Sequence, residues 1–195
     1  MKYLTILFFV LATTFAAQAQ ELQEGQIELV KAGKLEGRGN LRYVRPDSST
    51  PRVVFRRDSS LLYCDLAIQN TLDKSVNAYG NILIEEAGGA VITADTLYYN
   101  NNTNIAELIG DVRMRDSTTT VTTDHLYYNL TTRNSYYLDH GKVEEDNNIL
   151  TSKKGYYYAG SQVIAFKDSV DLYDPDANRT VKTDSLTYFT ANKVA

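Results

Sequence analysis

The sequence is poor in the residues that define disulfide-bonded, metal-binding and Pro-rich chains. Its 195 residues include one cysteine, three prolines, two histidines and no tryptophan. The single thiol, Cys64, excludes an internal disulfide framework and a Cys-rich zinc site. Eleven glycines and three prolines exclude collagen-like and Pro-rich disordered chains. The net charge of −4 is not the basic excess that nucleic-acid binders carry, so nucleic acid is not an expected partner.

Only one long apolar run is present, and it lies at the N-terminus. Lys2 precedes an apolar stretch over residues 4–12, and a small-x-small site follows at residues 17–19. This pattern predicts a cleavable secretory signal peptide over residues 1–19. A membrane anchor would need about 20 apolar residues, and polar side chains dilute this run from Thr13 onward. We therefore expect an exported, periplasmic domain over residues 20–195.

Tyrosine is the abundant aromatic residue, with fifteen copies against six phenylalanines. Tyrosine favours half-buried pleated surfaces, which predicts β structure. Apolar residues also alternate with polar ones, as in the run Ala106, Leu108, Val112 and Met114, which share one parity. A period of two is typical of a strand with one apolar face, and no 3.6-residue pattern runs for three turns. The expected fold class is all-β.

A repeat of about 30 residues runs along the chain. Its clearest copies read T-A-D-T-L-Y-Y-N and T-T-D-H-L-Y-Y-N. The anchor positions are Asp65, Asp95, Asp124, Lys153 and Asp184, which are 30, 29, 29 and 31 residues apart, and a weaker copy precedes them. A second half-unit recurs with a glycine at Gly80, Gly110 and Gly141 and with Asp168 in its place in the next copy. The last copy is incomplete, so either the chain is part of a longer protein or its last strand is an exposed edge.

The apolar parity changes at each anchor. Ile92 and Ala94 share a face with Leu97 and Tyr99 only if the chain gains one residue between the pairs. A β-bulge or corner supplies that residue. We therefore expect structural corners whose carboxylates accept hydrogen bonds from backbone N–H groups, at Asp65, Asp95, Asp124 and Asp184.

The same residues allow other interpretations. The aspartates could form a carboxylate ladder, as in some glycan-cleaving β-solenoids, but an active site needs one distinctive pair rather than a copy in every unit. The tyrosine pairs could be a stacking platform for sugars, although packing across strands is the simpler interpretation. His125 and His140 lie in different halves of a unit without a further ligand at metal-binding spacing. We expect no catalytic residues, metal or cofactor.

The signal peptide and the repeated T-A-D-x-L-Y-Y-N and G-x-V-x-M units resemble the OstA-like, LptA-type periplasmic lipopolysaccharide-transport family. The likeness covers residues 27–195, which look like the N-terminal part of the longer OstA-like proteins of Bacteroidetes type. The resemblance implies an open β-jellyroll of two facing antiparallel sheets. It also implies that the slot between the sheets takes up the acyl chains of lipid A, and that subunits or homologous transport proteins join edge to edge.

These implications define an inward-facing set of side chains. Six units at a strand spacing of about 4.8 Å would give a slot roughly 30 Å long, which exceeds the hydrocarbon depth of one leaflet, about 15 Å. For those side chains of the set that lie in the middle of the sandwich, ordinary core packing is as good an interpretation as lipid binding. The set comprises Ile82, Ile84, Ile92, Leu97, Tyr99, Ala106, Leu108, Val112, Met114, Val121, Leu126, Tyr128, Ile164, Phe166, Val170, Leu172, Val181, Leu186 and Tyr188.

The expected function is lipid binding in lipopolysaccharide transport to the outer membrane, by passive transfer without a catalysed reaction. An exposed last strand would pair with another chain, either a second copy in a head-to-tail homo-oligomer or another transport protein. The alternatives are a glycan-binding or glycan-cleaving β-solenoid and a structural surface repeat protein.

Overall fold

A computed structural model describes residues 25–189, which form an all-β fold without a helix. None of these residues therefore belongs to a helix that is long and apolar enough to cross a membrane. The predicted signal peptide lies outside the described residues. The strands are β1 (Ile27–Lys31), β2 (Lys34–Arg38), β3 (Leu41–Arg45), β4 (Val53–Arg57), β5 (Ser60–Cys64), β6 (Leu66–Asn70), β7 (Ser75–Glu85), β8 (Val91–Asn100), β9 (Ile105–Arg115), β10 (Thr119–Asn129), β11 (Ser135–Tyr137), β12 (Gly141–Glu145), β13 (Asn148–Ser152), β14 (Lys154–Tyr158), β15 (Val163–Asp174) and β16 (Arg179–Phe189).

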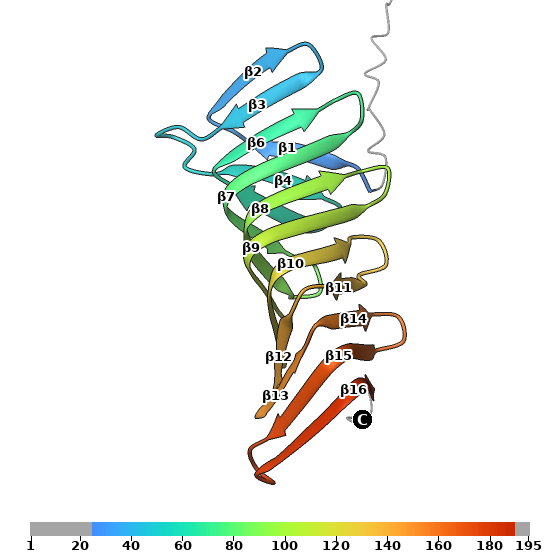
Figure 1. The fold of residues 1–195 in the computed structure, drawn as a ribbon. Coiled ribbons are helices and arrows are strands. Elements are labelled where there is room, and N and C mark those ends of the chain that lie inside the picture. Colours follow the sequence, from blue (N-terminus) through green and yellow to red (C-terminus); the bar gives the residue numbers. More distant parts are fainter. Residues whose placement is uncertain (1–24, 190–195) are drawn as a thin grey trace, which may run out of the picture.

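The strands form two antiparallel sheets that are joined along one side. Sheet one has the order β2-β3-β6-β7-β8-β9-β10-β11-β14-β15-β16, and sheet two has the order β1-β4-β5-β7-β8-β9-β10-β12-β13-β15-β16. The six long strands, β7–β10, β15 and β16, contribute one half to each sheet. The units stack along one axis, with the N-terminal strands at one end and β16 at the other (Figure 1). The predicted open β-jellyroll is therefore confirmed.

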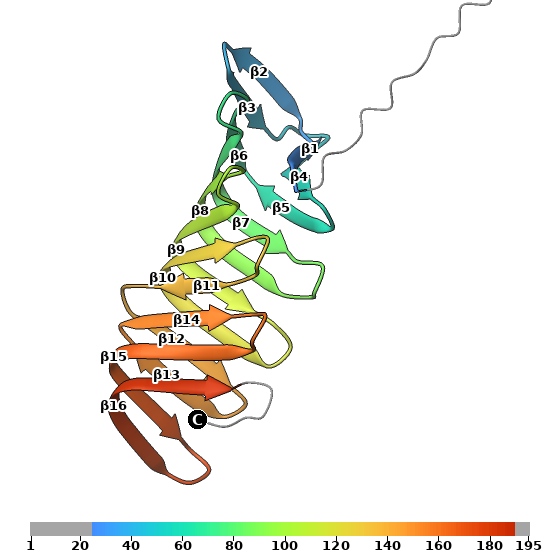
Figure 2. The same ribbon diagram turned by 90° about the vertical axis from the view of Figure 1, so that its right-hand side faces the viewer.

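Each long strand changes sheets at a bend, and the bends together form what we call the spine. The pairing register shifts there, for example between Thr93 and Thr96 in β8 and between Thr123 and His125 in β10. The skipped residues include the repeat anchors Asp95 and Asp124. Side chains on both sides of a bend consequently face the interior. The successive crossings are visible as a ladder of strands in Figure 2.

Two consecutive left-handed residues form the corner opposite an anchor. Gly80 and Asn81 have φ of 75° and 48°, and Gly110 and Asp111 have φ of 81° and 42°. Asp65 lies tightly over Gly80, where an added Cβ would be 2.8 Å from its carboxylate. Glycine is required here because it tolerates positive φ and leaves room for the anchor carboxylate.

Gly141 does not occupy the corresponding corner. The positive φ of that unit falls on His140 (54°), one residue earlier, so the alignment of Gly141 with Gly80 and Gly110 is wrong. Gly141 has a different physical role, because the ring of Tyr137 lies where its Cβ would be. In the next unit, Asp168 and Ser169 take the left-handed positions without any glycine.

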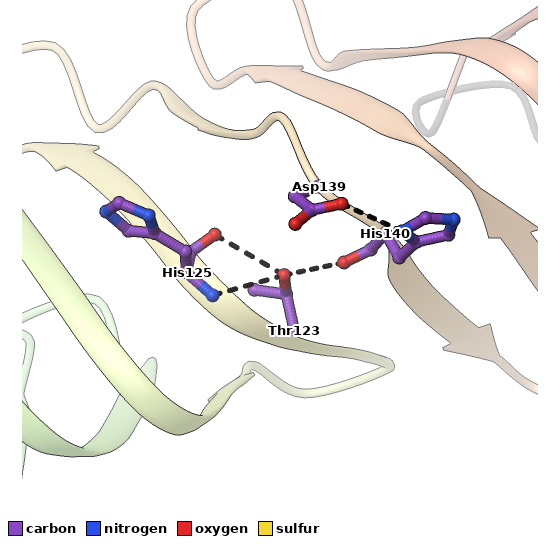
Figure 3. Close-up of polar contacts among 4 residues, drawn as sticks. All are labelled: Thr123, His125, Asp139 and His140. Atoms are coloured by element: carbon purple, nitrogen blue, oxygen red, sulfur yellow. Dashed lines mark hydrogen bonds and ion pairs between the residues drawn. The ribbon is translucent and has the colours of Figure 1, made fainter.

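At three of the bends, the residue before the anchor has a hydroxyl group that hydrogen-bonds to a backbone carbonyl. Thr123 Oγ1 donates to the carbonyl of His140 at 2.7 Å and contacts the backbone of His125 (Figure 3). Ser152 Oγ donates to Lys154 O at 2.9 Å, and Thr183 Oγ1 donates to Ser185 O at 3.1 Å. The side chain of the residue before the anchor therefore contacts the backbone of the residue after the anchor, across the bulge. We did not predict these hydrogen bonds from the sequence, although a threonine or serine stands at each of these positions.

Candidate functional site

The space between the sheets is hollow in the C-terminal half. A cavity of about 390 Å³ opens there, within the usual volume range of small-molecule sites. Its lining strands are β9, β10, β11, β12, β14 and β15. The lining residues are Met114, Asp116, Thr118, Thr119, Val121, Leu126, Ser135, Tyr136, Tyr137, Val143, Glu145, Gly155, Tyr156, Tyr157, Gln162, Ile164 and Phe166.

A second cavity of about 180 Å³ continues the first toward β16. Val143, Glu145, Ile164 and Phe166 line both, so the two spaces adjoin. Together they form what we call the slot. The lining of the second cavity is completed by Asn148, Leu150, Leu172, Asp174, Arg179, Val181, Leu186 and Tyr188.

The N-terminal half has a packed interior instead. Phe55, Val44 and Val53, from β3 and β4, are fully buried and join the inward residues of β7, β8 and β9 in one cluster. The space remaining at its open side has a volume of only about 20 Å³. Side chains from the first strands thus occupy the volume that is empty farther along the array.

Arg57 closes the open side of this packed half. Its side chain is 8% exposed and extends from β4 in sheet two. Its guanidinium donates to Asn104 Oδ1 at 2.9 Å and Thr131 Oγ1 at 3.2 Å, in turns that flank strands of sheet one, and to Gly25 O at 2.8 Å. The planar, permanently charged group suits such a multiple contact. Arg57 shares the inward parity of Val53 and Phe55, which was the sequence signal for its burial.

Tyr137 forms part of the wall of the larger cavity. Its ring lies against Gly141 and Gly155, where any Cβ would overlap it, and its hydroxyl lies 2.7 Å from Ser152 Oγ. Burial raises the pKa of the Tyr137 hydroxyl. Tyr137 is absent from the predicted inward set, although its parity matches that of Ser135, which is also buried.

The structure divides the predicted inward set between the slot and the packed core. Nine members line the slot: Met114, Val121, Leu126, Ile164, Phe166, Leu172, Val181, Leu186 and Tyr188. Val170 is buried beside it in the C-terminal cluster. The other nine lie in the packed core: Ile82, Ile84, Ile92, Leu97, Tyr99, Ala106, Leu108, Val112 and Tyr128. The slot is consequently shorter than one that runs the whole length of the array. Val181 is 38% exposed at its far end.

The charged residues that line the slot are predominantly acidic. Asp116 and Glu145 line the larger cavity, and Asp174 and Arg179 line the smaller one. Asp116 lies close enough to the Tyr157 hydroxyl to contribute to raising its pKa, after burial, which is the larger cause. An apolar interior with polar groups at its edge is suited to an amphiphilic molecule.

The aspartate anchors are distributed along the spine, one per unit. Asp65 accepts a hydrogen bond from Asn81 Nδ2 at 2.6 Å. Its donor is therefore a side-chain amide and not the backbone N–H group that we expected. Asp95 lies over Gly110, and Asp124 and Asp184 are exposed. Among the described residues, no group of three or more His, Cys, Asp or Glu side chains is placed to hold a metal ion.

The two histidines and the cysteine lie on the same spine. The imidazoles of His125 and His140 point in opposite directions, and they contact Glu107 at 2.8 Å and Asp139 at 2.9 Å respectively (Figure 3 shows the second contact). Cys64 is fully buried, and this burial raises the pKa of its thiol to about 12. A thiol held neutral in this way is a poor nucleophile and metal ligand.

The comparison with protein families agrees with this architecture. A family model described as OstA-like protein matches residues 25–184. No curated protein matches the chain significantly. The family model covers nearly all of the described β-jellyroll, from the strands of the packed half to those around the slot. The chain therefore belongs to the OstA-like protein family.

Proposed function

We propose that the slot binds acyl chains of lipid A and shields them from water while lipopolysaccharide crosses the periplasm to the outer membrane. The observation that carries this proposal is the apolar slot itself, in a protein whose other half has a packed interior. Phe166, Ile164 and Val143 face both of its cavities. Each methylene group moved from water into such a space gains about 0.8 kcal/mol.

Family membership supports a general role in lipopolysaccharide or lipid transport. OstA-like proteins form a transport and binding family rather than an enzyme family, and they are typically periplasmic. The predicted signal peptide would direct the chain to that compartment. Transfer would be passive, because reversible burial of an acyl chain needs no covalent step.

The proposal includes association through the free edge of β16. Within the described residues, this strand pairs only with β15. Among the described residues, its other edge has no partner strand, and such an edge favours the addition of a strand from another chain. A second copy or another transport protein would supply that strand.

Site-specific photo-crosslinking in cells tests the lipid proposal. A benzophenone amino acid at Phe166 places the reactive group in the slot, whereas one at Leu108 places it in the packed core. A third position, Tyr173, is 40% exposed and serves as a control that leaves the interior intact. We expect lipopolysaccharide to be labelled from position 166 alone. Absence of labelling from a folded, exported 166 variant, or equal labelling from position 173, would contradict the proposal.

A further inference from the structure

The outer face of sheet one carries a row of tyrosine side chains across neighbouring strands. Tyr127 pairs with Tyr136, and Tyr136 pairs with Tyr156. Their rings stack, with centroids 4.7 Å and 6.1 Å apart and interplanar angles of 16° and 24°. The row continues on the other side through Glu107 to Tyr98, because Tyr127 pairs with Glu107 and Glu107 with Tyr98.

Glu107 interrupts this row where a further ring would fit. Tyr98 and Tyr127 are two strand intervals apart, about 9.6 Å, which is roughly the distance at which a single flat ring can lie between two others. A surface hollow of about 340 Å³ has Tyr98, Glu107 and Tyr127 in its lining, together with Tyr136. Tyr98, Glu107 and Tyr127 alternate along their strands with the buried Leu97, Leu108 and Leu126, so these three side chains belong to the outer face of the sheet. Tyr136 borders both this hollow and the larger cavity of the slot.

The polar groups around the hollow indicate what kind of ring it would take. Asn77 and Asn100 contribute amides, and Ser75 and Thr103 contribute hydroxyls. Glu107 is the only charged side chain of the lining, and its carboxylate is held by His125 Nε2 at 2.8 Å. This set can donate and accept hydrogen bonds without neutralising an anion. It therefore suits a ring bearing many hydroxyl groups and disfavours an acidic one.

We propose that the hollow between Tyr98 and Tyr127 is a binding site for a neutral saccharide, with one pyranose ring inserted between the two tyrosines. The amides of Asn77 and Asn100 and the carboxylate of Glu107 bind its hydroxyl groups. This site is independent of the proposed lipid-binding function, since it faces away from the interior.

Native affinity electrophoresis of the purified chain tests the site, with dextran, mannan or β-glucan in the gel and polygalacturonate as the acidic polymer. Wild type is expected to be retarded by at least one neutral polymer and not by polygalacturonate. Glu107→Tyr fills the gap in the row with a β-favouring aromatic residue, and Tyr98→Ala removes one wall. Glu107→Tyr is expected to abolish the retardation, because its ring takes the place of the sugar. Tyr98→Ala is expected to weaken binding about tenfold, as for one lost stacking contact.

Tyr173→Ala is the matched control, because this exposed tyrosine lies on the outer face of the other sheet. It should leave the retardation unchanged. Thermal unfolding of each variant shows whether the fold is retained, and two chemically different variants make the test independent of one failure to fold. The proposal is overturned if no neutral polymer retards wild type, if polygalacturonate retards it more strongly, or if folded Glu107→Tyr binds as wild type does.

Discussion

At the scale of single residues, the spine depends on the close contact between a corner glycine and the carboxylate of an anchor. Gly110 has a φ of 81° and lies directly under the carboxylate of Asp95, so a side chain there would be strained in its backbone and would also meet that carboxylate. Gly39 has a φ of 60° but no neighbouring atom within 4 Å. Gly39 therefore needs glycine only for its positive φ, whereas Gly110 needs it for its positive φ and for the space that Asp95 takes up.

We expect Gly110→Ala to lower the free energy of unfolding by about 3 kcal/mol, since strain and overlap add. Gly39→Ala should cost only about 1 kcal/mol, the penalty of the left-handed conformation alone. Urea unfolding monitored by circular dichroism measures both values. Equal losses would show that the contact with Asp95 contributes nothing, and adding Asp95→Ala to Gly110→Ala should recover part of the loss.

Cys64 makes stability depend on pH in the alkaline range. The native pKa of the thiol, about 12, lies above its ordinary value near 8.5, so the folded state keeps a proton that the unfolded chain loses. The thiol's contribution is therefore complete below pH 8.5 and declines as the pH rises toward 12. Relative to Cys64→Ala, wild type should lose about 1 kcal/mol per pH unit between pH 9 and 11.

Urea titrations of both proteins at pH 7, 9 and 10 measure this difference. The alanine variant accounts for the titration of the tyrosines and lysines, which both proteins share. Parallel stability curves across the three pH values would mean that the thiol is solvated in the native state.

At the scale of the strands, the link between the two sheets distinguishes the two halves of the molecule. In the N-terminal half, Arg57 joins β4 to turns that flank β9 and β10, at Asn104 and Thr131. No comparable buried arginine spans the sheets around the slot, as far as the described residues show. The two halves share one topology and differ in what lies between their sheets.

Replacing Arg57 with leucine should lower the free energy of unfolding by about 3 kcal/mol. The change removes three hydrogen bonds that a charged donor makes to partly buried acceptors. Arg56→Ala is the control, because its exposed ion pair with Glu28 is worth about 1 kcal/mol or less. Chemical denaturation measures both variants, and losses of similar size would argue against a bridging role for Arg57.

The strands and bends could be predicted from the sequence, because alternation and a repeated aspartate are local signals. Ile92, Ala94, Leu97 and Tyr99 are all buried across a register shift, as their parity required. The limits of the slot could not be predicted in this way. Leu108 and Phe166 have the same parity pattern, yet Leu108 packs in a filled core and Phe166 lines a cavity. The difference depends on the volume supplied by distant strands, such as Phe55 on β4.

At the scale of the whole molecule, the two ends of the array present different edges. Within residues 25–189, the edge strands are β1 and β2 at the N-terminal end and β16 at the other end (Figures 1 and 2). The proposed end-to-end association would join β16 of one copy to an N-terminal edge strand of the next. Because these edges differ, the association would be heterologous and open-ended. Such growth has no intrinsic limit to the number of copies.

Thr187→Pro should weaken this association, because a proline on the edge strand β16 is unfavourable for pairing with a further strand. Sedimentation velocity over a range of concentrations is expected to show association of wild type and a shift of the variant toward the monomer. A proline at exposed Leu72, in the turn before β7, provides a control away from both edges. A concentration-independent monomer for wild type would refute edge pairing.

The packed interior of the N-terminal half has a consequence for any such assembly. If copies are joined end to end, each slot ends against the filled core that contains Leu108, Val112 and Phe55, where the remaining space is about 20 Å³. The hydrophobic spaces of successive copies would be separate compartments rather than one continuous conduit. A lipid would then advance in discrete steps, leaving one compartment before it enters the next.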